Sequence, residues 1–257
     1  MISSTSIVSP EAKLGENVIV GDFSIIGPNV SIGDNTVIES NVVIKGHTKI
    51  GVNNKIYQFS SIGEIPQDKK YNNEKTKLVI GDNNIFREYC SVHTGTVSDQ
   101  GVTIIGNNNL FLAYVHIAHD CIVGSHTTFS NCSQLAGHVV VDDHASLGGF
   151  SGVHQFCNIG SYSFVSGGTM VVKDILPFTL VSGNPPKPYG LNIVGLKRNG
   201  FDDKEISNLK LAYKIIYREN NTIQESVKKI SEIVDESYSI EKLIKFIKNI
   251  GSRGITR

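Results

Sequence analysis

Aliphatic side chains recur at every sixth position through the first two-thirds of the chain. Eleven successive positions, six residues apart from residue 2 to residue 62, are each Ile, Val or Leu, and glycine follows at six of them. The frame returns at Ile80, Phe86 and Val92. It restarts at Ile105, and all twelve positions from there to Val171 are again apolar.

A period of six predicts a parallel β-helix. Residues six apart scatter around an α-helix with 3.6 residues per turn, and a simple strand repeats at two. A short strand plus a corner fits six, with glycine where the backbone turns. Three such units close a triangular coil of about eighteen residues, and stacked coils enclose a continuous apolar core. We therefore expect an all-β parallel β-helix domain over residues 1–190.

Two polar stretches interrupt the repeat, near residues 64–78 and near residues 94–102. A coil can eject a loop without losing its register, and such loops often carry binding residues. A surface excursion without function explains each stretch equally well. We expect two loops that leave the coils at these points.

The pattern becomes helical after a connector rich in Pro and Gly, residues 182–190. Capping-box spacing at 202–205 and at 222–225 predicts two helix starts. Apolar residues between Ile223 and Ile247 follow helical periodicity. We expect a small α-helical C-terminal domain over residues 191–257, serving as a cap and a subunit contact.

Composition limits the classes of partner and compartment. Twenty-four Lys and Arg residues balance 24 Asp and Glu residues, so no overall charge favours nucleic acid or an anionic membrane. No apolar run approaches the roughly 18–20 residues of a membrane span, and the first residues lack a signal-peptide pattern. We expect a cytoplasmic protein. Cys121 and Cys157 are two coils apart, about 10 Å, which exceeds disulfide reach and predicts free thiols.

Seven of the eight histidines fall between residues 93 and 154, and none occupies the inward aliphatic position. The repeat therefore forces none of them into the core. Because residues eighteen apart share a column, His119 should lie below Gly137 and Gln155, with Asp120 and His138 in the neighbouring column. His116 should share a column with Gln134, Gly152 and Met170.

This arrangement predicts acyl-transfer chemistry around His119. A histidine can serve as a general base near neutral pH, and a neighbouring carboxylate can orient its ring. A bare glycine lets a backbone N–H reach a developing oxyanion. Two other interpretations stay open: solvated surface histidines, and zinc bound by histidines of adjacent coils and chains.

Four strings carry a resemblance to a known family: His116-Ile-Ala-His-Asp-Cys121, Leu135-Ala-Gly-His-Val139, Val153-His-Gln-Phe156 and Gly195-Leu-Lys-Arg198. Together they resemble the UDP-N-acetylglucosamine O-acyltransferases, over nearly the whole chain. The resemblance implies a left-handed β-helix and a homotrimer with active sites between subunits. It implies transfer of a 3-hydroxyacyl chain from acyl carrier protein to the glucosamine 3-OH of UDP-N-acetylglucosamine, the first step of lipid A biosynthesis. No metal, other cofactor or covalent acyl-enzyme is expected.

The resemblance also implies roles for individual residues. His119 would be the general base, Asp120 would orient it, and the Gly137 N–H would stabilise the oxyanion. The sugar and acyl pocket would be lined by His116, His138, His154 and Gln155.

Further residues are expected to contact the substrates. In the substrate loop that includes Gln67, Asp68 would meet the sugar and Lys70 the diphosphate. Asn192 would contact the nucleotide and Arg198 the phosphates. Gly167 matches the position that gauges acyl length, and glycine there favours a longer chain.

The chain departs from better-known members of the family at Val194, Asn199 and Pro185, where those carry Glu, Arg and His. The effect of these departures on the nucleotide contacts stays open. Three rival functions remain. A related N-acyltransferase normally carries an extra N-terminal domain, whereas repeats here begin at Ile2. A γ-type zinc carbonic anhydrase and a non-catalytic hexapeptide binding module are the others. The acyl length, and the choice between a 3-OH and a 3-amino acceptor, stay open.

Overall fold

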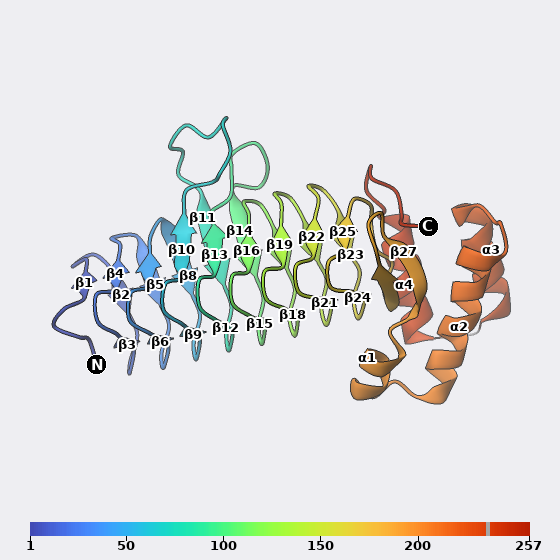
Figure 1. Ribbon diagram of the computed structural model, residues 1–257, viewed down its shortest axis with the longest axis horizontal. Coiled ribbons are helices and arrows are strands. Elements are labelled where there is room, and N and C mark those ends of the chain that lie inside the picture. The colour runs from blue at the N-terminus through green and yellow to red at the C-terminus, as the bar shows by residue number, and fades with distance from the viewer. Residues whose placement is uncertain (235–236) are drawn as a thin grey trace.

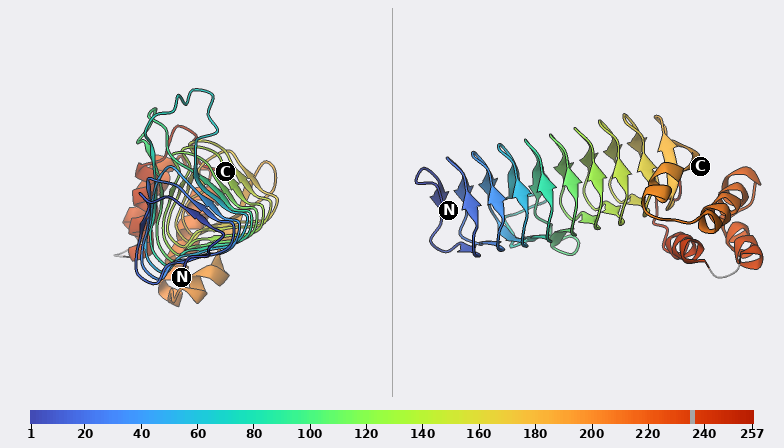
Figure 2. Two further views of the ribbon diagram at one scale, coloured as in Figure 1. Left: turned by 90° about the vertical axis from the view of Figure 1, so that its left-hand side faces the viewer. Right: turned by 90° about the horizontal axis from the view of Figure 1, so that it is seen from below.

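Three parallel sheets form the faces of a left-handed triangular coil in the computed structural model, which describes residues 1–234 and 237–257. The triangular cross-section is visible down the coil axis (Figure 2). The chain passes from the first sheet to the second, then to the third, and returns to the first one coil further along (Figure 1). The predicted parallel β-helix is confirmed.

The strands are short, because each coil turns three corners. The first sheet contains, in spatial order, β1 (Ile7–Val8), β4 (Ile25–Ile26), β7 (Val43–Ile44), β10 (Ser61–Glu64), β13 (Ser91–His93), β16 (His116–Ile117), β19 (Gln134–Leu135), β22 (Gly152–Val153) and β25 (Met170–Val171). The second contains β2 (Lys13–Leu14), β5 (Val30–Ile32), β8 (His47–Ile50), β11 (Lys77–Ile80), β14 (Val102–Ile105), β17 (Ile122–Val123), β20 (Val140–Val141) and β23 (Asn158–Ile159). The third contains β3 (Ile19–Val20), β6 (Val37–Ile38), β9 (Lys55–Ile56), β12 (Ile85–Phe86), β15 (Leu110–Phe111), β18 (Thr128–Phe129), β21 (Ser146–Leu147), β24 (Phe164–Val165), β26 (Thr179–Ser182) and the antiparallel β27 (Lys187–Leu191).

The period-six residues point inward and stack in register. Ile26 pairs with Ile44, and Ile44 pairs with Ile62, and all three are at most 1% exposed. Burying such columns of apolar side chains stabilises the coil. Ile2, in the first coil, was expected inward but is 52% exposed.

Corner residues adopt left-handed backbone conformations at regular intervals. Asp120, His138 and Phe156 have φ values of 58°, 63° and 65° in three successive coils. Such values are uncommon outside glycine, so the packing of each coil on its neighbour must hold them. The same corner therefore presents its side chains in the same direction from coil to coil.

The two predicted loops leave the coils on the same side of the molecule (Figure 1). One joins β10 to β11 and covers 65–76, and the other joins β13 to β14 and covers 94–101. The register resumes after both, since Ser61 pairs with Ser91 and Val92 pairs with Ile117. The strands thus extend slightly into the stretches expected to be loops.

Four helices cap the C-terminal end of the coil in the described part of the chain: α1 (Ile193–Arg198), α2 (Asp203–Arg218), α3 (Ile223–Ile233) and α4 (Tyr238–Lys248). Asp202 and Thr222 cap α2 and α3 as predicted. The helices pack with Leu176 and Phe178, from the end of the coil, into a second apolar cluster. The division of the chain after residue 190 falls inside β27 and stays a prediction. Among the described residues, none of the helices has the length and apolar character that crossing a membrane requires.

The C-terminal tail returns to the β-helix. Ile255 forms a parallel bridge with Asp174, whose fully buried carboxylate accepts hydrogen bonds from the backbone N–H groups of Gly251 and Asn158 at 3.0 and 2.8 Å. The Arg253 Nε donates to the Gln155 carbonyl at 3.1 Å. The tail therefore reaches the edge of the histidine cluster.

Candidate active site

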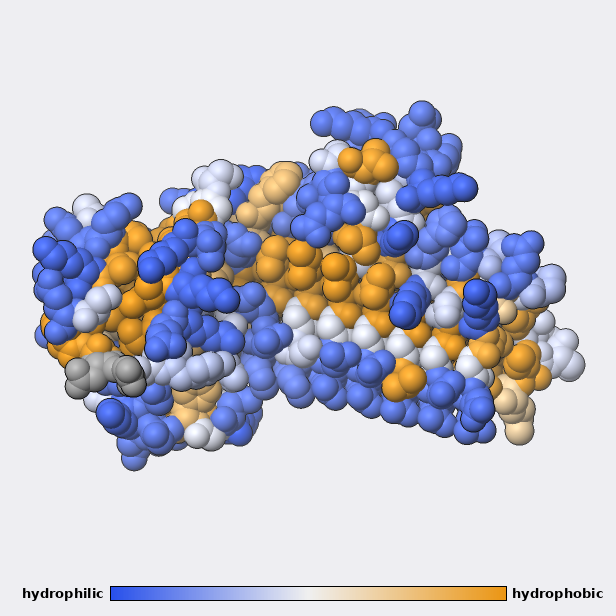
Figure 3. All heavy atoms as spheres, turned by 180° about the vertical axis from the view of Figure 1, so that it is seen from behind, coloured by the Kyte–Doolittle hydropathy of each residue, from blue (hydrophilic) through white to orange (hydrophobic). Residues whose placement is uncertain are grey.

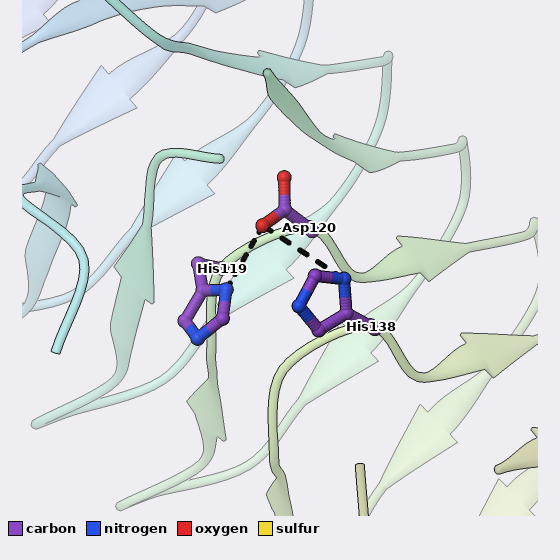
Figure 4. A group of neighbouring side chains, drawn as sticks. All are labelled: His119, Asp120 and His138. Atoms are coloured by element: carbon purple, nitrogen blue, oxygen red, sulfur yellow. Dashed lines mark hydrogen bonds and ion pairs between the residues drawn. The ribbon is translucent and has the colours of Figure 1, made fainter. Parts of the chain in front are cut away.

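His119 and Asp120 form a buried hydrogen-bonded pair at the corner between β16 and β17. The His119 Nδ1 lies 2.9 Å from Asp120 Oδ2. Burial alone would raise the pKa of Asp120, but hydrogen bonds from His119 and from both the hydroxyl and the N–H of Thr96 outweigh it and lower the pKa. An ionised carboxylate can only accept, so Nδ1 carries the proton and Nε2 presents its lone pair on the far side of the ring (Figure 4).

Gly137 lies directly against the His119 ring. The two corners are joined by the hydrogen bond from the His138 N–H to the His119 carbonyl, 3.1 Å. A Cβ at residue 137 would stand 2.5 Å from Cε1 and 2.7 Å from Nε2 of His119, so only glycine fits without displacing the ring. Among the described residues the Gly137 N–H has no acceptor, and it remains available to a ligand.

His138 completes the cluster from the next coil. Its Nδ1 lies 2.7 Å from Asp99 Oδ2 and 3.9 Å from Asp120 Oδ2. The ring stacks on Phe156 at 4.4 Å and meets the His119 ring edge-to-face at 5.0 Å. His119, Asp120 and His138 offer donor atoms within 4.8 Å of one another, and two nitrogens with a carboxylate suit zinc (Figure 4). A metal assay therefore belongs among the tests of function.

Two further histidines form a wall beside the pair. The His116 Nδ1 lies 2.8 Å from Ser91 Oγ, and the His93 ring meets the His116 ring edge-to-face at 4.9 Å. Burial, followed by the charge of His119, lowers the pKa of His116. Burial, followed by the charge of His116, lowers the pKa of His93 to about 4. This wall is therefore uncharged at neutral pH. His93 and His119 are nevertheless buried, each 5% exposed, although neither occupies the inward aliphatic position of the repeat.

A cavity of about 550 Å³ extends from His119 along the outer face of the first sheet. Its lining residues are Gln67, His116, Ala118, His119, Gln134, Leu135, Ala136, Gly137, Gly152, Val153, His154, Gln155, Met170, Val171 and Val172. At the end remote from His119, the Met170 side chain lies over Gly152, where a Cβ would stand 2.9 Å from its sulfur. The cavity thus has a polar end at the histidines and an apolar end three coils along.

A second cavity of similar size, about 580 Å³, lies between the second sheet and α4. Asp142, Lys242 and Lys245 are among its lining residues. Burial raises the pKa of Asp142. The histidine cluster belongs to the other cavity, which we therefore take as the candidate active site.

The structure gathers six of the expected site residues in this cavity: Gln67, His116, His119, Gly137, His154 and Gln155. Asp120 and His138 stand directly behind them. Asp68 and Lys70 lie in the 65–76 loop, where the Asp68 carboxylate accepts the Lys70 N–H at 3.0 Å. Their expected contacts with the sugar and the diphosphate stay predictions.

Three expected residues lie elsewhere in the single chain. Gly167 is at the corner between the third and first sheets, beside the carbonyl of Gly149. Asn192 caps α1, and its amide accepts from the Gly195 N–H and donates to the Tyr162 carbonyl. Arg198 ends α1. A single chain does not bring these three to His119.

Sequence reasoning missed Thr96, Asp99 and Arg253, all of which touch residues of the cluster. The interruption of the repeat predicted the loop that contains Thr96 and Asp99. It could not predict where their side chains lie, because a loop has no sequence period. Arg253 lies about a hundred residues from Gln155, and no pattern relates the two. Met170 was placed in the column of His116, but no role was predicted for it.

Two family profiles match the chain. Residues 174–256 match the profile described as UDP-N-acetylglucosamine O-acyltransferase, domain 2, and residues 11–46 and 103–137 match bacterial transferase hexapeptide repeats. The solved UDP-N-acetylglucosamine O-acyltransferase from Moraxella catarrhalis superposes with a TM-score of 0.96 at 44% identity, covering 100% of this chain and 99% of that one. The enzyme from Bacteroides fragilis gives 0.97 at 40% identity and covers 100% of both chains.

Curated relatives agree over their full length. The acyl-[acyl-carrier-protein]–UDP-N-acetylglucosamine O-acyltransferase of Thiobacillus denitrificans is 54% identical, and that of Alkalilimnicola ehrlichii is 49% identical. Each comparison covers 100% of this chain and 99% of the relative. The chain belongs to the acyl-[acyl-carrier-protein]–UDP-N-acetylglucosamine O-acyltransferase family.

Proposed function

We propose that this chain transfers a 3-hydroxyacyl group from acyl carrier protein to the glucosamine 3-OH of UDP-N-acetylglucosamine, the opening reaction of lipid A biosynthesis. One observation supports this more than any other. His119, whose Nδ1 is bonded to Asp120, lines a groove whose wall beside its Nε2 is the bare backbone of Gly137. That combination provides a base and an oxyanion donor at one point, as acyl transfer requires.

The proposed reaction needs no acyl-enzyme. The His119 Nε2 removes the proton of the sugar 3-OH as the oxygen attacks the thioester carbonyl carbon, forming the new C–O bond. The Gly137 N–H donates to the resulting oxyanion, and Asp120 stabilises the imidazolium through Nδ1. When the oxyanion collapses, the C–S bond breaks and His119 returns its proton to the departing thiolate of the carrier.

The groove suggests where each substrate lies. Gln67, His154 and Gln155 surround the polar end, which suits the sugar. The apolar end at Met170 suits the acyl chain. We propose that Asp68 and Lys70 reach the sugar nucleotide from their loop, although they are not among the residues that line the cavity.

We further propose a homotrimer. Asn192, Arg198 and Gly167 would then reach the groove of an adjacent subunit, which would explain their distance from His119 within one chain. An exposed aromatic stack supports an interface. Phe59 and Tyr89 lie 5.0 Å apart, Tyr89 and Tyr114 lie 4.7 Å apart, and all three are roughly half exposed.

Exposed apolar surface also runs as a band along the β-helix on the face opposite to that of Figure 1 (Figure 3). Large apolar patches commonly mark association sites. We also propose a cytoplasmic location, which the four free cysteines support, because free thiols suit a reducing compartment.

A product assay tests the proposed function. Purified protein is incubated with 3-hydroxyacyl carrier proteins of several lengths and with either the 3-OH or the 3-amino sugar nucleotide, and the products are identified by mass spectrometry. We expect acyl transfer to one acceptor and its loss in His119→Ala. Undiminished transfer by that variant would remove His119 from its role. One tightly bound zinc per chain without acyl transfer would favour the carbonic anhydrase alternative.

A further inference from the structure

The 94–101 loop closes over the histidine cluster and adds a second carboxylate to it. The Thr96 carbonyl accepts from the N–H groups of both Asp99 and Gly101, at 3.3 and 3.0 Å, which folds the loop into a tight turn. The Thr96 N–H and hydroxyl donate to the Asp120 carboxylate at 2.8 and 2.6 Å. This anchor fixes the turn, and the turn brings Asp99 to His138.

The contact between Asp99 and His138 spans 39 residues and is short. The Asp99 Oδ2 lies 2.7 Å from the His138 Nδ1. Asp120 cannot replace it, because its Oδ2 is 3.9 Å from the same nitrogen, beyond hydrogen-bond distance. Asp99 is therefore the carboxylate that decides which nitrogen of His138 carries the proton.

The other contacts of His138 leave undetermined whether its imidazole ring is flipped. The corner fixes its backbone at φ 63°, and stacking on Phe156 at 4.4 Å with an interplanar angle of 9° fixes the plane of its ring. Stacking does not determine which ring edge points in which direction, since a flipped ring stacks equally well. A carboxylate on Nδ1 removes that ambiguity, as carboxylates do for histidines that bind metals or act in triads.

We infer that Asp99 is a positioning residue that holds His138 with Nδ1 protonated and Nε2 directed toward the space in front of His119. Figure 4 shows the Nε2 of His138 on the side of its ring nearer His119. This inference rests on the proposed function, which places the acceptor sugar in that space. The site thus has two acid–histidine pairs: Asp120 with the base His119, and Asp99 with His138, which presents a hydrogen-bond acceptor to a sugar hydroxyl.

The arrangement predicts a defect in sugar binding rather than in chemistry. Asp99→Ala leaves the Thr96 anchor and the His119–Asp120 pair in place. A His138 ring free to change tautomer or to flip should raise KM for the sugar nucleotide about tenfold. The kcat value and the KM for acyl carrier protein should stay within about twofold of wild type. Asp99→Asn keeps an oxygen that can accept from Nδ1 and should recover most of the loss.

The experiment combines kinetics with a direct view of the ring. Steady-state kinetics are measured for wild type, Asp99→Ala, Asp99→Asn and the control Gln100→Ala, which alters the next, exposed residue of the same loop. Imidazole ¹⁵N spectra of histidine-labelled protein, assigned with His138→Gln, report the tautomer of His138 without any substrate. We expect the Nδ1–H tautomer in wild type, a mixture in Asp99→Ala, and wild-type behaviour in Gln100→Ala.

Two results would overturn the inference: an unchanged His138 tautomer in Asp99→Ala, or a KM for the sugar nucleotide equal to that of the Gln100→Ala control. Either would show a surface contact without a positioning role. If wild type transfers no acyl group at all, the proposed function fails, and the spectra still decide whether Asp99 sets the tautomer of His138. A thermal melt of each variant verifies that the comparison is made on folded protein.

Discussion

Gly137 and His119 lie eighteen residues apart in the sequence and in direct contact in the structure, where a Cβ on the glycine would stand 2.5 Å from the imidazole Cε1. Gly137→Ala should therefore push the ring away from its position. We expect kcat to fall by about 10²-fold, because the base and the oxyanion donor move together. Overpacking should cost about 1–3 kcal/mol of stability. Kinetics and urea unfolding measure the two effects.

Gly27→Ala is the matched control. It also lies just after a strand of the first sheet, but a Cβ there would come no closer than 3.4 Å to another atom. This variant should keep wild-type kcat. Equal activities in the two alanine variants would contradict the close packing of residue 137 on the base.

The general base gives the second prediction. His119→Ala should lower kcat by about 10²- to 10⁴-fold with little change in KM. Asp120→Asn should also lower kcat strongly, because a neutral amide does not stabilise the imidazolium that forms on His119. The double variant should be little worse than His119→Ala alone, since the two residues act as a unit. Additive losses in the double variant would separate their roles.

Acyl length gives the third prediction. The Met170 side chain lies over Gly152 at the apolar end of the groove. Met170→Ala should open that end and shift the preferred donor toward longer acyl chains, whereas Met170→Leu, of similar volume, should keep the wild-type preference. Competition between carrier proteins of several acyl lengths measures the shift. An unchanged preference in Met170→Ala would place the acyl chain elsewhere.

Stability at acid pH gives the fourth prediction. Burial lowers the pKa of His93 to about 4 in the folded chain, from an ordinary value of 6.5. His93 therefore becomes protonated near pH 6.5 in the unfolded chain but only near pH 4 in the folded chain. Between these two pH values the unfolded state binds the proton more strongly, so His93 lowers the free energy of unfolding as pH falls. The loss should approach about 2 kcal/mol per chain after allowance for solvent screening.

His93→Gln removes this titration. Urea midpoints at pH 7.5 and pH 4.5, at one protein concentration, should differ less for this variant than for wild type. His126→Gln, which alters an exposed histidine, should keep the wild-type difference. A wild-type pH dependence in His93→Gln would mean that His93 becomes protonated in the folded chain near its ordinary pKa.

The sequence predicted the positions of residues that belong to the repeating coils, but few positions in the loops. The column of His119, Gly137 and Gln155 followed from the spacing of eighteen alone, because strand pairing fixes the register. Asp99 could not be placed, since its position depends on hydrogen bonds within a loop that has no period. The burial of His93 was missed for the same reason: the spacing describes the coil but not what covers it.

The contacts of the C-terminal tail and of the first coil are also not predicted by the repeat. Arg253 reaches Gln155 because the buried Asp174 holds the returning tail. Ile2 fits the repeat and is nevertheless exposed, so the period alone does not predict burial in the first coil. Contacts at the ends of the coil and in the loops involve pairs of side chains that do not recur from coil to coil, so the repeat cannot predict them.

The ejected loops leave the register of the coil unchanged, and this separates two kinds of evolutionary freedom. The 65–76 and 94–101 loops can change length or composition while strand pairing keeps the distance between His119 and Gly137. Substrate preference can therefore diversify through the 65–76 loop. In the 94–101 loop the position of Asp99 can change only as long as Thr96 keeps its hydrogen bonds to Asp120. The coil thus fixes the spacing of the reacting groups, and the loops beside it supply the residues that can vary.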